Sequence, residues 1–116
     1  MPEGDTIQLP PRHRAILKAV LARFADRIDR AAIFGSRALG RASAASDIDL
    51  VLYGSLDDRE VARIWTLLHE SSLPVSVDVV RYEGLDQGPF RRHVEAYAKP
   101  LFTREELLDA NMAGAT

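Results

Sequence analysis

The sequence contains no cysteine, which excludes disulfide bonds, thiolate zinc sites and a cysteine nucleophile. It also has no apolar run of about 20 residues, the length that a membrane-spanning helix requires. Neither sign of charge is in clear excess, since 15 lysines and arginines and 17 aspartates and glutamates leave a net charge of −2. This balance argues against broad binding of nucleic-acid phosphates, although a local basic patch remains open. We therefore expect no membrane partner, because there is no long apolar run, and we do not expect a nucleic acid as the main partner.

The chain does contain enough apolar residues for one core, since they make up 47% of its 116 residues, and this suits a single globular domain. Its first residues, MPEGDTIQ, are acidic and lack the apolar segment of a signal peptide, so we expect a cytoplasmic protein. Three of the six prolines lie in residues 1–11, which we interpret as a flexible leader. The domain is then predicted over residues 12–110, and a frayed tail over residues 111–116.

Hydrophobic periodicity predicts helices that alternate with short strands. The first four predicted elements are a helix from Arg12 whose apolar stripe reaches Ile28, a strand at 31–34, a short helix at 36–40 and a strand at 47–53. They are followed by a helix that Asp57 caps, a strand at 75–81 and helices at 89–98 and 104–110. Trp65 lies on the apolar stripe of the helix after Asp57 and is expected in the core. The pattern indicates an α/β domain with helices packed on a small sheet.

The first chemically informative feature is the pair Gly35-Ser36, where a predicted buried strand turns into a short predicted helix. Backbone N–H groups at such a turn, aided by the helix dipole, favour an anion such as phosphate. Gly35 lets the backbone approach a ligand closely, and the Ser36 hydroxyl is a further donor. Arg37 and Arg41 flank this turn, where they could either steer a triphosphate or be exposed surface charges.

The second feature is a set of three aspartates. Asp47 and Asp49 are two residues apart on a predicted strand, so both side chains project from one face, with Cα atoms about 6.6–6.8 Å apart. Asp78 joins them if the strands 47–53 and 75–81 are neighbours. Three such carboxylates repel one another, and a pair of divalent cations such as Mg²⁺ or Mn²⁺ relieves the repulsion. A phosphate-binding turn beside a two-metal carboxylate site indicates phosphoryl or nucleotidyl transfer.

The stretch GSRALGRASAASDIDL, followed by VSVDVV, resembles the minimal nucleotidyltransferases of the DNA polymerase β-like superfamily. The spacing from Gly-Ser to Asp-x-Asp is similar to that of the family's antitoxins, which pair with HEPN-domain toxins in prokaryotes. The resemblance covers about residues 12–102 and implies the polymerase β-like fold, a small mixed β-sheet packed with helices. One departure lies at Ala98-Lys99-Pro100, ahead of Leu101-Phe102, where the family often has a Glu-Gly turn.

The resemblance also implies a role for each site residue. ATP would be bound by Gly35, Ser36 and Arg37. Gly35 and Ser36 would hold its β- and γ-phosphates. Asp47 and Asp49 would bridge two Mg²⁺ ions, and Asp78 would bind the catalytic metal and help to deprotonate the attacking hydroxyl. AMP would pass to a tyrosine hydroxyl of the partner HEPN toxin, and pyrophosphate would leave. The chain would then be the antitoxin of a type VII-like toxin–antitoxin pair and would form a hetero-oligomer with its partner.

Two alternatives to this function are open. The fold could be a non-catalytic antitoxin that masks its partner by binding, although the chain has all three aspartates of the motif. It could also be a stand-alone nucleotidyltransferase with a small-molecule acceptor, although relatives that modify antibiotics usually carry an extra helical domain. For a protein partner, the predicted apolar patch consists of Leu101, Phe102, Leu107 and Leu108.

Overall fold

Residues 7–114, which the computed structural model describes, form one four-stranded sheet with four α-helices around it. In chain order the elements are α1 (Pro11–Ala22), β1 (Ile28–Phe34), β2 (Ile48–Gly54), α2 (Asp58–His69), β3 (Val77–Arg81), the short 3₁₀ helix η2 (Tyr82–Gly84), α3 (Pro89–Tyr97), β4 (Lys99–Thr103) and α4 (Arg104–Gly114). The strand order is β3-β2-β1-β4, with β2 and β3 parallel and the other neighbouring pairs antiparallel. The expected α/β class, with a small mixed sheet packed with helices, is confirmed.

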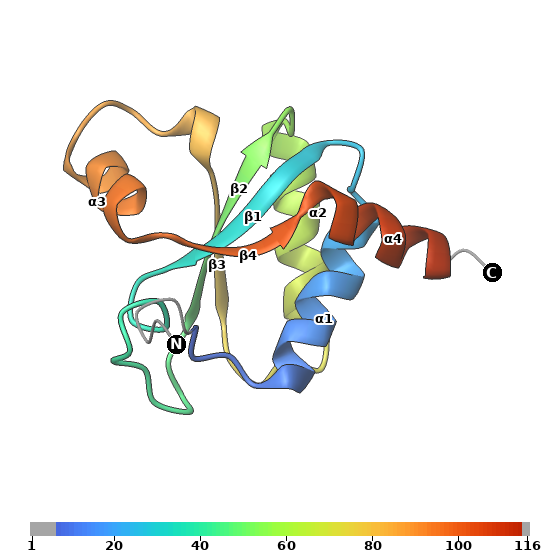
Figure 1. The fold of residues 1–116 in the computed structure, drawn as a ribbon, viewed down its shortest axis with the longest axis horizontal. Helices are drawn as coiled ribbons and strands as arrows, with labels where there is room; N and C mark the ends of the chain where they lie inside the picture. The colour runs from blue at the N-terminus through green and yellow to red at the C-terminus, as the bar shows by residue number, and fades with distance from the viewer. Residues whose placement is uncertain (1–6, 115–116) are drawn as a thin grey trace.

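The two faces of this sheet are covered differently (Figure 1). Helices α1 and α2 lie against one face, and α3 lies over the other. Because side chains alternate along a strand, β2 sends Leu50 and Leu52 to the first face and Asp49 and Val51 to the second. The smaller apolar cluster, on the face under α3, has as its buried members Ala32, Phe34, Val51, Tyr53 and Val94. The acidic position of β2 therefore lies on the face with the smaller core.

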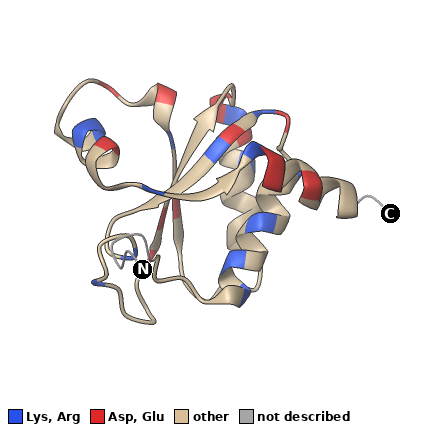
Figure 2. Cartoon of the chain, viewed as in Figure 1, with Lys and Arg blue, Asp and Glu red and all other residues tan. Residues whose placement is uncertain are grey.

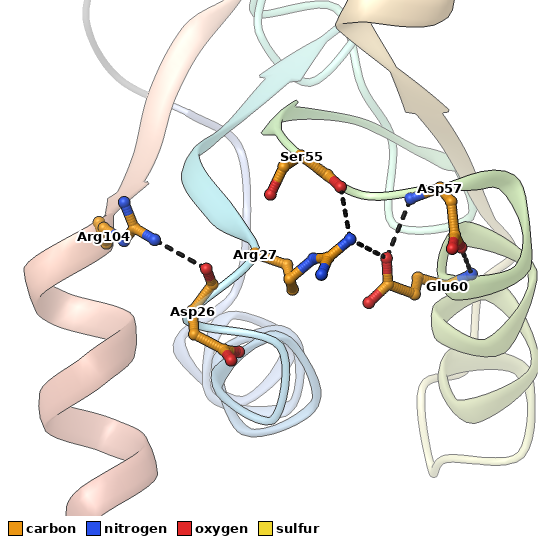
Figure 3. A network of polar contacts seen from close by, with 6 residues as sticks. All are labelled: Asp26, Arg27, Ser55, Asp57, Glu60 and Arg104. Carbon is orange, nitrogen blue, oxygen red and sulfur yellow. Dashed lines mark hydrogen bonds and ion pairs between the residues drawn. The ribbon is translucent and has the colours of Figure 1, made fainter.

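Polar contacts hold the helices at the end of the sheet where β2 finishes (Figure 3). Asp57 and Glu60 form a capping box at the start of α2, in which the Glu60 amide donates to the Asp57 carboxylate at 2.8 Å and the Asp57 amide to the Glu60 carboxylate at 3.0 Å. Arg27 donates to the Ser55 carbonyl at 2.9 Å and pairs with Glu60 at 3.3 Å. Arg104, at the start of α4, donates at 2.7 Å to a carbonyl in the turn between α1 and β1. The predicted cap at Asp57 is thus confirmed.

Three local predictions differ from the structure. Residues 36–40 form consecutive turns, so the short helix predicted there is wrong. Helix α1 ends at Ala22, and Ile28, which the apolar stripe placed on this helix, instead begins β1. The sequence pattern also does not identify β4, a five-residue strand at the edge of the sheet. Its Pro100 is tolerated because an edge strand need not donate every amide to a neighbour.

Helix α2 has a narrower buried face than its apolar stripe predicts. Ile64 and Leu68 are buried, but Trp65 is 47% exposed and stacks on His69, with ring centroids 3.9 Å apart. Successive residues point about 100° apart around a helix, so with Ile64 at the centre of the buried face, Trp65 falls at its margin. The expectation that Trp65 is in the core is wrong.

The predicted apolar partner patch is also wrong, because most of it is in the core. Leu108 is 38% exposed, whereas the other three members are buried: Leu101, Phe102 and Leu107. Phe102 of β4 and Leu107 of α4 both belong to the larger apolar core cluster, which also contains residues of α1 and α2. These three buried residues therefore contribute to stability, and Leu108 is the only member of the predicted patch that a partner could reach.

Ordered structure extends beyond the predicted domain at both ends of the described region. Residues 7–10 belong to the predicted leader, yet Ile7 and Leu9 pack against the core. At the other end, α4 continues through residues 111–114, the start of the predicted tail. Residues 1–6 and 115–116 lie outside the described region. Within residues 7–114, the helices are too short or too polar to cross a membrane.

Candidate active site

The chain turns sharply at Gly35, directly after β1. Gly35 has a φ of +76°, in the left-handed region that favours glycine. A Cβ atom here would overlap the Oδ2 oxygen of Asp49, so the turn backbone lies directly against this carboxylate. The amides of Ala38 and Leu39 both donate to the Gly35 carbonyl at 3.1 Å, as in a turn. Because no regular helix follows, the predicted phosphate site has to rely on the amides of the turn and the Ser36 hydroxyl, without a helix dipole.

Asp49 and Asp78 are direct neighbours on the parallel strands β2 and β3. Figure 2 shows acidic residues on these two adjoining strands. Burial, and then the negative charges of Asp78 and Asp47, raise the pKa of Asp49 above its ordinary value of 3.8. A charge on His93 acts in the opposite direction. Asp49 therefore carries a negative charge that its surroundings compensate poorly, and a bound cation would relieve this strain.

Asp47 is placed differently from the other two aspartates. Strand β2 begins at Ile48, so Asp47 lies just before the strand. The alternation of side chains along β2 therefore does not place Asp47 on the same face as Asp49. Its side chain is exposed, although its charge still acts on Asp49. Among residues 7–114, no three acidic, histidine or cysteine side chains already surround a common point as metal ligands would. The structure thus brings Asp49 and Asp78 together and leaves Asp47 at the rim.

Arg37 is a buried charged residue, and its guanidinium is occupied by carbonyl groups of the protein. Only 3% of the residue is exposed. The guanidinium donates to the carbonyls of Gln8 at 2.8 Å, Ser46 at 2.7 Å and Asp47 at 3.4 Å. Arg41, in contrast, is exposed. The two arginines that flank the Gly35 turn in sequence therefore have different environments.

Helix α3 borders the carboxylate pair and brings a residue that the sequence motifs do not indicate. Phe90 packs edge-on against Phe34, with ring centroids 5.6 Å apart, and Phe34 is the β1 partner of Asp49 in the sheet register. His93 follows Phe90 by one helical turn, and its charge lowers the pKa of Asp49. The sequence has no second histidine at a metal-ligand spacing from His93, so no motif marks it as a site residue. Its closeness to Asp49 follows from the way α3 packs on the sheet.

The donors of this site fit a hard divalent cation bound together with a phosphate. Asp49 and Asp78 offer carboxylate oxygens, which Mg²⁺ prefers as ligands. The poorly compensated charge of Asp49 is the kind that such an ion would offset. The turn at Gly35 lies against the Asp49 carboxylate. Its amides, and the hydroxyl of Ser36 as the next residue, are donors of the kind that bind phosphate oxygens. The arrangement is suited to chemistry at a phosphorus atom.

The sequence matches one family model, and the fold is similar to several solved structures. The family model for polymerase beta, nucleotidyltransferase, matches residues 16–107, a range that includes every site residue from Gly35 to Asp78. A crystal structure of a toxin–antitoxin with AMP-PNP superposes with a TM-score of 0.65 at 19% identity, over 88% of this chain and 86% of that one. The toxin–antitoxin MntA-HepT gives 0.58 at 18% identity, over 88% and 80%. A putative nucleotidyltransferase from Sulfolobus solfataricus gives 0.52 at 20% identity, over 81% and 83%.

A search of curated proteins finds no match to this chain. At identities of 17–20%, the similar structures establish the fold and leave the reaction to be argued from the site.

Proposed function

Because the chain belongs to the polymerase β nucleotidyltransferase family, we propose that it transfers AMP from ATP to a tyrosine hydroxyl of a HEPN-type partner toxin in a Mg²⁺-dependent reaction. The modified toxin is inactive in this proposal, and the chain is its antitoxin. The observation that carries the proposal is the contact between the Gly35 turn and the Asp49 carboxylate, which lies in register with Asp78. This contact supports the proposal because it brings the turn that would bind phosphate against a carboxylate that would bind a cation.

Each group in the site has a distinct role. Gly35 and Ser36 bind the β- and γ-phosphates of ATP through backbone amides and the hydroxyl. Asp49 and Asp78 would hold Mg²⁺ with Asp47 as a further ligand, and the two ions would offset the negative charge of the phosphates when bound. His93 lies near enough to moderate the charge of Asp49. The site thus combines anion and cation binding within a few residues of two neighbouring strands.

Asp78 is the residue best placed to receive the acceptor proton. It lies on β3, the edge strand of the sheet, and its side chain is exposed, whereas Asp49 is partly buried between β1 and β3. In the reaction, the tyrosine oxygen forms a bond to the α-phosphorus while the bond from this phosphorus to the α–β bridging oxygen breaks. The phenolic proton passes to the Asp78 carboxylate and then to water, and pyrophosphate leaves. The open edge at β3 gives a protein acceptor access to this position.

Two observations support a toxin as the acceptor. Three of the solved structures with this fold are toxin–antitoxin proteins, and one of them was crystallised with AMP-PNP, an analogue of ATP. The net charge of −2 also gives little support to a nucleic-acid acceptor, whose phosphates would be repelled. A protein acceptor agrees with both observations.

The test is transfer of label from ATP that is labelled on its α-phosphate. The purified chain is incubated with this ATP, Mg²⁺ and the HEPN-type protein encoded beside it, and mass spectrometry locates the modified residue. We expect AMP on a tyrosine of the partner, with transfer lost in Asp49→Asn and Asp78→Asn. Asp109→Asn, an exposed carboxylate on α4, is the matched control and is expected to retain transfer.

Three results would contradict the proposal. Label that stays on ATP under all conditions would exclude transfer to this partner. If folded Asp49→Asn and Asp78→Asn proteins neutralise the toxin as well as the unaltered chain does, the antitoxin acts by masking and catalysis is not required. Labelled pyrophosphate release without a modified partner, from ATP labelled on its γ-phosphate, would indicate a different acceptor.

A further inference from the structure

The loop between the Gly35 turn and β2 has few apolar contacts to hold it. Most residues from Leu39 to Ala45 are exposed. A hollow of about 400 Å³ lies beside the loop, between the N-terminal segment 8–10 and residues 42–44. This loop ends at Asp47, whose negative charge acts on Asp49. A loop that carries a functional residue without apolar anchors needs polar ones to keep its shape.

Arg37 provides these polar anchors. Its guanidinium donates to the carbonyls of Ser46 and Asp47 at the end of the loop and to the carbonyl of Gln8 in the N-terminal segment. Gln8 completes the connection, since its amide donates to the Arg37 carbonyl at 3.0 Å and its side-chain oxygen accepts from the Ala42 amide at 2.8 Å. One buried cation and one glutamine therefore connect the N-terminal segment to both halves of the loop.

We propose that Arg37 is a positioning residue, whose guanidinium fixes the place of Asp47 relative to Asp49 through the carbonyls of Ser46 and Asp47. Its effect on AMP transfer rests on the proposed function, but its effect on the loop does not. This role replaces the expectation that Arg37 binds ATP. A planar guanidinium can donate in several in-plane directions at once, which the ammonium of a lysine cannot reproduce.

The test measures Mn²⁺ binding by electron paramagnetic resonance in the absence of nucleotide, together with amide hydrogen exchange over residues 43–47. Removing a group that orients a metal ligand typically weakens metal binding by about 10- to 100-fold, so we expect Arg37→Gln to weaken Mn²⁺ affinity by about tenfold. Exchange in the loop should become faster. Arg37→Lys should lie between Arg37→Gln and the unaltered chain. Arg41→Gln, an exposed arginine of the same loop, is the matched control and should change neither quantity.

Contact of Arg37 with the triphosphate would have different consequences. Arg37→Gln would then raise the KM for ATP and leave both nucleotide-free Mn²⁺ affinity and loop exchange unchanged, and this result would overturn the proposal. If Arg37→Gln does not fold, the comparison moves to Arg37→Lys, for which unchanged Mn²⁺ affinity and exchange in a folded protein would be equally decisive. If Mn²⁺ binding weakens as expected while no variant or unaltered chain transfers AMP, the positioning role stands and the proposed function fails.

Discussion

Among residues 7–114, the core on the sheet face under α1 and α2 contains seventeen buried apolar residues, whereas the face under α3 contains five. Because apolar burial is the main source of stability, the first face holds the domain together. The second face carries Asp49 and Asp78, which cost stability when they are brought together without a cation. Strand β2 contributes to both faces through alternate residues. Strand β2 thus places stabilising residues on one face of the sheet and candidate functional residues on the other.

Aromatic and charged groups replace apolar packing on the second face. The rings of Tyr53 and Tyr82 stack with centroids 4.8 Å apart, and Arg30 lies over Tyr53 at 3.7 Å. Arg91 of α3 lies over Tyr82 at 4.8 Å, and the Tyr82 hydroxyl donates to Glu95 on the same helix. These contacts attach α3 to the sheet. The helix that borders the site is therefore held by polar groups to a greater extent than α1 and α2 are.

The largest expected loss of stability distinguishes the two faces directly. Leu50→Ala, on the face under α1 and α2, should lower the free energy of unfolding by about 3 kcal/mol. Val51→Ala, the next residue and equally buried on the other face, should lower it by about 1.5 kcal/mol, since fewer carbons leave a smaller cluster. Urea denaturation measures both values. A loss for Val51→Ala that equals the loss for Leu50→Ala would mean that the two faces contribute alike.

A second prediction isolates the contact between the turn and the site. Gly35 and Gly40 have almost the same left-handed backbone, with φ of +76° and +74°, but a Cβ atom overlaps Asp49 only at Gly35 and meets no atom within 4 Å at Gly40. Alanine at either position should cost about 1 kcal/mol of backbone strain. Gly35→Ala should cost about 1 kcal/mol more, because the Asp49 side chain must move, and it should abolish AMP transfer.

Thermal melts and the label-transfer assay check this pair of variants. Gly40→Ala should transfer AMP at the normal rate despite its strained backbone. Equal loss of stability and activity in both variants would show that backbone strain alone, and not the contact with Asp49, makes glycine necessary after β1.

The third prediction concerns pH and has a smaller effect. Since the pKa of Asp49 is raised in the folded protein, the folded state holds this proton more readily than the unfolded state, and stability falls as pH rises through the interval above 3.8. The full penalty is present at neutral pH. In EDTA at neutral pH, Asp49→Asn should therefore have a higher Tm than the unaltered chain, by no more than a few degrees. The difference should disappear below the ordinary carboxyl pKa, and Mg²⁺ should raise the Tm of the unaltered chain only.

Melting curves from acid to neutral pH, with and without Mg²⁺, measure this difference. Asp109→Asn, whose carboxylate lies on α4, should show no such pH-dependent gain. A lower Tm for Asp49→Asn at neutral pH in EDTA would mean that the carboxylate pair stabilises the fold, contrary to the comparison of the two faces.

Local sequence signals were sufficient for the parts of the fold that depend on local physics. Alternation predicts that Asp47 and Asp49 share a face of β2, with Asp78 beside them if β2 and β3 are neighbours. The pairing of Asp49 with Asp78 confirms that the strands are neighbours, whereas Asp47 lies before the first residue of β2. The capping pair at Asp57 predicts the start of α2. The position of Arg37 could not be predicted in this way, because it depends on a hydrogen bond to Gln8, 29 residues away. Short segments without a full period, such as β4 and the turns at 36–40, also escape local patterns.

The smallest expected effect concerns Trp65 and tests how far the buried face of α2 extends. As a core residue, Trp65 would cost about 3–5 kcal/mol on truncation to alanine. With 47% of the residue exposed and its ring against His69, we expect a loss of about 0.5 kcal/mol. Ile64→Ala is the matched control on the same helix, and its complete burial predicts a loss of about 3 kcal/mol. If Trp65→Ala approaches the loss for Ile64→Ala, the buried face of α2 is wider than the structure indicates, and the core on this side of the sheet extends over residues that we assign to the surface.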